Sequence, residues 1–104
     1  MYAGFVKEFL MSENICRVSF KLPKEAAPNA ESVNLVGDFN LWDIYATPMK
    51  KDTEGNFRVT VDLEKGREYQ FRYVTDETKW ENDWHADKYV PSPIGEAMNS
   101  VVIV

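Results

Sequence analysis

Apolar and polar residues alternate along much of the chain after residue 14, and a period of two is the spacing of a half-buried β-strand. The clearest run is CRVSFKL at 16–22, where arginine, serine and lysine separate the apolar side chains. The runs at 56–63 and 67–75 alternate in the same way. Only a short segment with a glycine, 64–66, separates them, which predicts a β-hairpin.

Further apolar runs add to these strands. SVNLVGDF at 32–39 and NSVVIV at 99–104 predict two more, and residues 48–51 predict a short one. Residues 76–98 are polar and aromatic and contain two prolines, so they predict a long loop. A loop of this length in a compact domain usually has a function.

Residues 1–14 fit either a helical turn or an added edge strand, whereas residues 15–104 are expected to form one domain. About seven short strands, with turns roughly every 8–12 residues and no long helix, predict an all-β fold. The expected architecture is an immunoglobulin-like antiparallel β-sandwich. It lacks the immunoglobulin disulfide, because the chain contains a single cysteine.

Composition fits one globular domain, since 44% of the 104 residues are hydrophobic and 28% are charged. The net charge of −5 argues against binding to nucleic acid or to anionic membranes, which both attract lysine and arginine. The first residues show neither a signal peptide nor a membrane span. A cytoplasmic protein is therefore the default expectation.

Few residues are suited to catalysis. Cys16 lies on the inward face of its predicted strand, where a thiol is inert, and His85 lies in the polar loop. Cysteine and histidine clusters with metal spacing are missing, and a lone sandwich has little room for the facing carboxylates of a glycosidase. We expect no catalytic residues, no cofactor and no metal.

Three tryptophans remain to be explained. Trp42, Trp80 and Trp84 are each flanked by polar or charged residues, which is unusual for a core strand. A flat indole face can stack on the C–H face of a pyranose ring while neighbouring polar groups bond its hydroxyls. In the alternative interpretation these rings cover the edge of the core, and Arg72 on the outward face is a solvated charge.

Three ordered motifs carry a resemblance to a known family. They are VNLVGDFNLWD at 33–43, YQFRYVTDETKW at 69–80 and NDWHADKYVPSPIGEAMNSVVIV at 82–104. They resemble the glycogen-binding module of AMP-activated kinase β subunits. They are even more similar to the early-set domain that precedes the catalytic barrel in isoamylases and branching enzymes. Both belong to carbohydrate-binding module family 48, and the resemblance covers residues 15–104.

The resemblance implies an early-set (E-set) sandwich and a set of glucan-binding residues. Trp42 and Trp80 would be the stacking platforms, and Arg72 stands where the family has a lysine. Many early-set domains of debranching enzymes pack on their catalytic domain instead of gripping glucan. The other site residues that the resemblance implies are Ile94, Asn99 and, at the family's threonine position, Glu96, with Trp84 as a further candidate.

The leading hypothesis is a non-catalytic module that binds α-1,4-glucans such as glycogen or starch. The alternative is an interaction module that docks on a glycogen-metabolism enzyme and does not bind sugar. The two hypotheses predict different arrangements of the tryptophan side chains. Trp42 and Trp80 on one face, with Arg72 and Asn99 between them, would favour sugar binding, whereas buried or opposed rings would favour docking.

Overall fold

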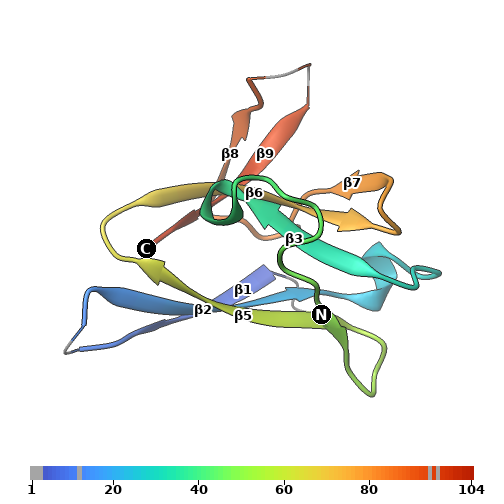
Figure 1. Cartoon of the computed structure of the whole chain (residues 1–104), viewed down its shortest axis with the longest axis horizontal. Coiled ribbons are helices and arrows are strands. Elements are labelled where there is room, and N and C mark those ends of the chain that lie inside the picture. The colour runs from blue at the N-terminus through green and yellow to red at the C-terminus, as the bar shows by residue number, and fades with distance from the viewer. Residues whose placement is uncertain (1–3, 12, 94, 96) are drawn as a thin grey trace.

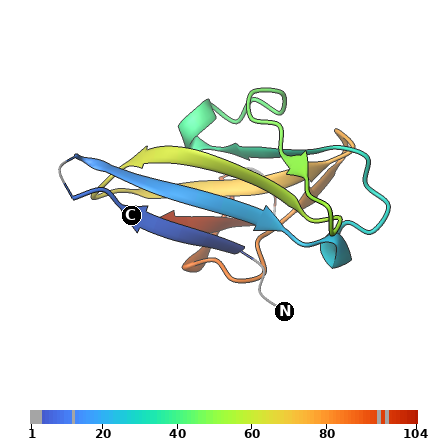
Figure 2. The same ribbon diagram turned by 90° about the horizontal axis from the view of Figure 1, so that it is seen from below.

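The chain folds as two antiparallel β-sheets packed face to face. The computed structural model describes residues 4–11, 13–93, 95 and 97–104. Figure 1 shows the two layers, and Figure 2 shows the first sheet from below with the second behind it. This arrangement confirms the predicted all-β sandwich of immunoglobulin-like type. No helix among the described residues is both long and apolar enough to cross a membrane.

The first sheet has the strand order β1-β2-β5-β4. Its two long strands pair over their full length, with Val18 opposite Val61. Apolar residues of the long strands face the second sheet, and their charged residues face outward. The strands are β1 (Gly4–Phe9), β2 (Ile15–Leu22), β4 (Lys50–Lys51) and β5 (Phe57–Glu64).

The second sheet has the order β3-β6-β9-β8, and β7 also pairs with β6. The central strand β6 therefore has β3 on one edge and, on the other edge, β9 followed by β7. Single 3₁₀ turns occupy Lys24–Ala26 and Asp38–Asn40. The strands are β3 (Val33–Gly37), β6 (Glu68–Thr75), β7 (Lys79–Glu81), β8 (Lys88–Pro91) and β9 (Met98–Ile103).

An aromatic cluster fills the space between the sheets. Phe71 of β6 packs edge-on against Phe20 of β2, with ring centroids 5.1 Å apart. It also meets Phe5 of β1 at 6.0 Å and Tyr73 at 5.7 Å. Such contacts add about 0.5–1.5 kcal/mol each to the burial of apolar area. Cys16 lies in the same core with no exposed surface, and burial raises the pKa of its thiol.

The structure settles one question that the sequence left open and shortens one predicted strand, that of residues 48–51. Residues 4–9 form an edge strand, β1, that pairs with β2 and not a helical turn. The residues around Pro48 form the short strand β4 and a single bridge between Pro48 and Asn34. The described residues thus form nine strands instead of about seven.

The prediction of one long loop over residues 76–98 was wrong. Two short strands, β7 and β8, lie within it and extend the second sheet. Their three and four residues are too few to show alternation, and both are mostly exposed. Pairing with β6 and β9 therefore determines their conformation more than their own pattern does.

Strand β3 is buried on both faces, which its alternation did not predict. Val36 has no exposed surface, and Asn34 is only 7% exposed. The chain returns along the edge of β3, where Leu35 N–H donates to Thr47 O and Met49 N–H donates to Val33 O. The strand also ends at Gly37, earlier than the predicted residue 39, because the backbone turns into a 3₁₀ helix.

Asp52 makes the stability of the fold depend on pH. Its carboxylate accepts a hydrogen bond from Arg58 Nε at 2.8 Å and bonds from the backbone N–H groups of Glu54 and Asn56. These bonds, that of Arg58 above all, lower the pKa of Asp52 to about 2. A carboxylate whose pKa is lower in the folded than in the unfolded state stabilises the fold at pH values above the unfolded-state pKa. This stabilisation is lost as the pH falls towards the folded-state pKa.

We expect wild type to be more stable than Asp52→Asn near neutral pH. This advantage should shrink as the pH falls from about 4 towards about 2, because the carboxylate then becomes protonated in both states. Urea unfolding of both chains at several pH values measures the difference. A difference that stays constant over this range would contradict the prediction.

Candidate functional site

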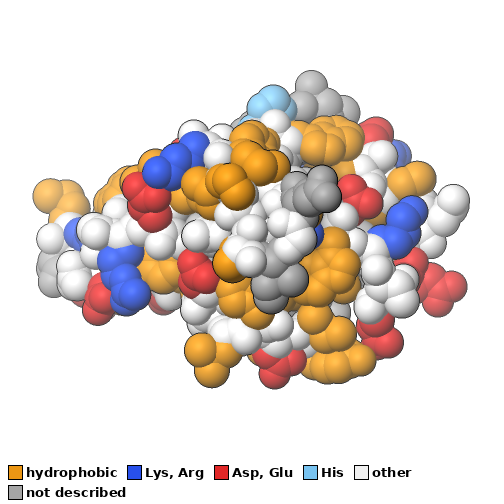
Figure 3. Space-filling view, turned by 90° about the horizontal axis from the view of Figure 1, so that it is seen from above, with side chains coloured by type: hydrophobic (Ala, Val, Ile, Leu, Met, Phe, Trp, Pro, Cys, Tyr) orange, Lys and Arg blue, Asp and Glu red, His pale blue; other side chains and the backbone are white. Residues whose placement is uncertain are grey.

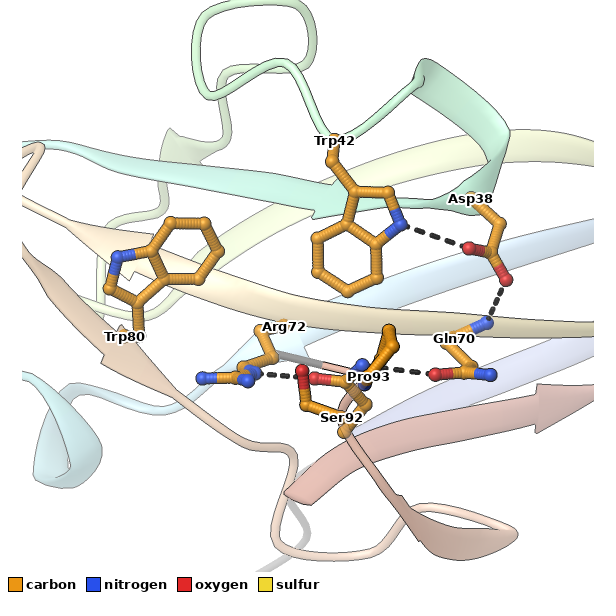
Figure 4. A pocket seen from close by; sticks show the side chains of 8 residues that line it. Asp38, Trp42, Gln70, Arg72, Trp80, Ser92 and Pro93 are labelled. Carbon is orange, nitrogen blue, oxygen red and sulfur yellow. Dashed lines mark hydrogen bonds between the residues drawn. The ribbon is translucent and has the colours of Figure 1, made fainter. Parts of the chain in front are cut away.

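The outer face of the second sheet carries an open cavity of about 550 Å³. In Figure 4 the indoles of Trp42 and Trp80 lie on the same side of β6, and Arg72 lies towards Trp80. The volume is within the range of about 300–1,000 Å³ that is usual for small-ligand sites. The residues that line the cavity are Asp38, Trp42, Gln70, Arg72, Trp80, Ser92, Pro93 and Asn99.

Trp42 is presented by a tight turn after β3. Asn40 organises this turn, since its side chain accepts the N–H of Gly37 and donates to Leu35 O and to Thr47 Oγ1. Leu41 and Trp42 both have left-handed backbones, with φ of 60° and 58°. Such residues cost roughly 1–3 kcal/mol each and persist only where their surroundings hold them. The strained backbone of these two residues is therefore held by the turn, and it fixes where the Trp42 indole lies.

Trp80 comes from the opposite end of the cavity, on β7. It pairs with Val74 of β6, so its side chain shares the outer face of the sheet with those of Arg72 and Val74. The ring is 44% exposed, and the Arg72 guanidinium carbon lies 5.6 Å from its centroid. The two tryptophans thus reach one cavity from segments 38 residues apart in the chain.

The segment that follows β7 is anchored by Asp83, which is 2% exposed. Tyr73 Oη donates to Asp83 Oδ2 at 2.7 Å, and Asp83 N–H donates to Ser100 Oγ at 2.9 Å. Burial raises the pKa of Asp83, while the hydrogen bonds from Tyr73 and from His85 N–H act in the opposite direction. These bonds tie the end of β7 to β6 and β9, which holds Trp80 in place.

A row of polar side chains forms the floor between the two indoles. Arg72 Nε donates to Asn99 Oδ1 at 2.6 Å, and Asn99 Nδ2 donates to Gln70 Oε1 at 2.9 Å. Asn99 is only 2% exposed, so its amide mainly orients its two neighbours. The terminal nitrogens of Arg72 have no hydrogen-bond partner among the described residues and remain available as donors.

Four of the predicted site residues meet in this cavity: Trp42, Arg72, Trp80 and Asn99. Trp84 is 50% exposed but is not among the described residues that line it. Ile94 and Glu96 lie outside the described residues. Ser92 and Pro93, just before them, do line the cavity.

Sequence reasoning missed Asp38 and Gln70. Asp38 lies within the GDFNLW turn, and Gln70 shares the outward face with Arg72, so both belong to segments that the sequence already marks. Their role depends on hydrogen bonds across strands that no local pattern shows. Among the described residues, no group of three or more His, Cys, Asp and Glu side chains is placed to hold a metal ion.

This arrangement suits a flat, neutral and polar ligand. Two partly exposed indoles offer apolar faces, and the arginine and glutamine between them, oriented by Asn99, offer polar groups. The face of a ring with C–H groups can lie on an indole while hydroxyl groups at its rim meet the polar floor. The Trp42 ring is half-buried and the Trp80 ring is more exposed, so neither tryptophan is an ordinary core residue.

Comparison with known proteins gives several similar sequences. The 1,4-alpha-glucan-branching enzyme of Saccharomyces cerevisiae is 56% identical over 39 residues, which are 36% of this chain and 6% of that enzyme. That of Aspergillus oryzae is 49% identical over 43 residues, 41% of this chain and 6% of the enzyme. The 1,4-alpha-glucan branching enzyme GlgB of Nitrosomonas eutropha is 36% identical over 80 residues, 72% of this chain and 11% of the enzyme.

The matched parts of these relatives are small, since the chain spans only 6% to 11% of their lengths. A family model gives a broader match. The model of carbohydrate-binding module 48, the isoamylase N-terminal domain, matches residues 23–90, which is more than half of the chain. This match confirms the family resemblance and covers the first two sequence motifs and the start of the third. The chain therefore belongs to carbohydrate-binding module family 48.

Proposed function

We propose that this domain binds α-1,4-glucan chains, such as those of glycogen or starch, and catalyses no reaction. The observation that supports the proposal most is that Trp42 and Trp80 line one cavity with Arg72 and Asn99 between them. This is the geometry expected of sugar binding. The similar branching enzymes are named for 1,4-alpha-glucan, which supports the same class of ligand.

The cavity favours a neutral chain of sugar rings over a charged ligand. Its polar floor carries both an arginine and, next to Trp42, the carboxylate of Asp38. A net charge of −5 adds no attraction for an anion. Stacking and hydroxyl bonding would therefore supply the affinity, with each aromatic contact worth about 0.5–1.5 kcal/mol.

A titration with maltoheptaose or β-cyclodextrin tests the proposal. We expect a saturable change in tryptophan fluorescence, with a Kd between roughly 10 μM and 1 mM, as suits two stacked rings and a few polar contacts. A β-1,4-linked glucan of similar length is the control, since its rings have the same hydroxyls but a straighter chain. No response at several millimolar α-glucan would contradict the proposal.

The same titration distinguishes the docking alternative. A domain that only docks on a glycogen-metabolism enzyme would show no change with glucan and would bind that enzyme through this face or another. Seen from above in Figure 3, the described hydrophobic side chains lie in several groups among polar ones. A partner enzyme and a cytoplasmic location remain predictions from the sequence.

A further inference from the structure

Hydrogen bonds link Trp42 to Arg72 by way of Asp38, Gln70 and Asn99, and a cation–π contact continues from Arg72 to Trp80. The path begins at the indole N–H of Trp42, which donates to Asp38 Oδ1 at 2.9 Å. The other carboxylate oxygen, Asp38 Oδ2, accepts the backbone N–H of Gln70 at 2.8 Å. The Gln70 side chain then continues through Asn99 to Arg72, which lies against Trp80. Figure 4 draws these hydrogen bonds as dashed lines that run from the Trp42 ring past Asp38 and Gln70 towards Arg72.

Asp38 attaches the indole of Trp42 to the sheet. Its carboxylate bridges an indole from the turn and a backbone group of the central strand β6. A hydrogen bond to an ionised carboxylate is roughly twice as strong as a neutral one. Asp38 itself is exposed, so these two bonds and not burial fix the position of its carboxylate.

The bond also decides which part of Trp42 is presented. An indole has one N–H donor and no other polar group. Because Asp38 takes that donor, Trp42 has only its ring faces and edges left for a ligand. Trp80 differs, since its indole nitrogen has no hydrogen-bond partner among the described residues.

We infer that Asp38 is a positioning residue, which sets the plane of the Trp42 platform relative to Trp80 without itself binding the ligand. This inference rests on the proposed glucan site for its effect on affinity. The bridge from the indole to β6 makes the orientation of one platform depend on the strand that carries Arg72. Loss of the carboxylate leaves the ring in the cavity but frees it to rotate.

The ligand-free wild-type chain provides the first test, by NMR of its three indole N–H groups. The Trp42 indole proton should resonate downfield of those of Trp80 and Trp84 and should exchange with solvent more slowly, because among the described residues Trp42 alone has a carboxylate partner for its indole. Equal exchange rates for the three protons would overturn the inference. This result does not depend on whether glucan binds, so it separates the inference from the proposed function.

The second test is a double-mutant cycle with maltoheptaose affinity as its readout. Asp38→Asn should weaken binding about tenfold, because an asparagine cannot accept both bonds and the ring loses its fixed plane. In a Trp42→Phe background, which keeps an aromatic ring but lacks the indole N–H, Asp38→Asn should change affinity less than about twofold. Equal effects in both backgrounds would show that Asp38 acts on the ligand directly and would overturn the inference.

Asp43→Asn is the matched control for the loss of a negative charge in the same turn. Asp43 lies next to Trp42 but its carboxylate accepts the backbone N–H of Tyr45, which an asparagine oxygen can also do. Its affinity for maltoheptaose and its Trp42 indole resonance should match those of wild type. An equal loss of affinity in Asp43→Asn would assign the effect to charge and not to positioning, which also overturns the inference.

Discussion

Gly37→Ala should lower the melting temperature by roughly 10–20 °C, which corresponds to about 2–3 kcal/mol for a domain of this size. A Cβ at this position would lie 2.5 Å from the carbonyl oxygen of Gln70 and 2.9 Å from Phe71 Cβ. The first of these atoms belongs to the backbone of β6, so it cannot move aside by a change of rotamer. Strands β3 and β6 would have to separate where Gly37 pairs with Phe71.

Gly66→Ala provides the control for this substitution. Gly66 has a φ of +81°, but an added Cβ would meet no atom within 4 Å. Its cost should therefore be only that of the left-handed backbone, about 1–2 kcal/mol. Thermal unfolding followed by circular dichroism measures both variants. A melting temperature for Gly37→Ala equal to that of wild type would show that the two strands can absorb the extra methyl group.

Trp80→Ala should weaken binding of maltoheptaose tenfold or more while the fold remains intact. Truncation of one aromatic hot spot often costs more than about 1.4 kcal/mol of binding free energy, which is a factor of ten in Kd. The ring is 44% exposed and lies on the outer face of the sheet, so its removal leaves no hole between the two layers. Fluorescence of the remaining tryptophans, or calorimetry, gives the affinity.

Trp84→Ala is the matched comparison for Trp80→Ala. Both tryptophans are about half exposed, but only Trp80 lines the cavity. The affinity of Trp84→Ala should stay within about twofold of wild type, because surface residues outside a hot spot contribute little. If Trp84→Ala lost affinity and Trp80→Ala did not, the glucan site would lie elsewhere on the domain.

The sequence predicts most of the sandwich because its long strands have one buried face each. In β2, the residues with period two from Cys16 to Leu22 are all buried, as alternation requires. The same holds for Tyr69, Phe71 and Tyr73 of β6. The family motifs then bring Trp42, Arg72, Trp80 and Asn99 together as candidates, and the structure places them around one cavity.

Features that depend on distant partners could not be predicted in this way. Strands β7 and β8 exist because β6 and β9 offer them free edges, and nothing in their own residues marks them. The bond from Trp42 to Asp38 is local, but its continuation to Gln70 crosses 32 positions of the chain. Side-chain networks of this kind follow from the register of strands, which is settled only when the sheet has formed.

Burial makes the single thiol, that of Cys16, unreactive while the domain is folded. The thiol is sealed between the layers, and desolvation keeps it protonated, so a reagent that needs a thiolate finds no target in the closed sandwich. Alkylation can proceed only in the moments when the layers come apart. Because the chain has a single cysteine, the rate of alkylation would report how often the two sheets separate.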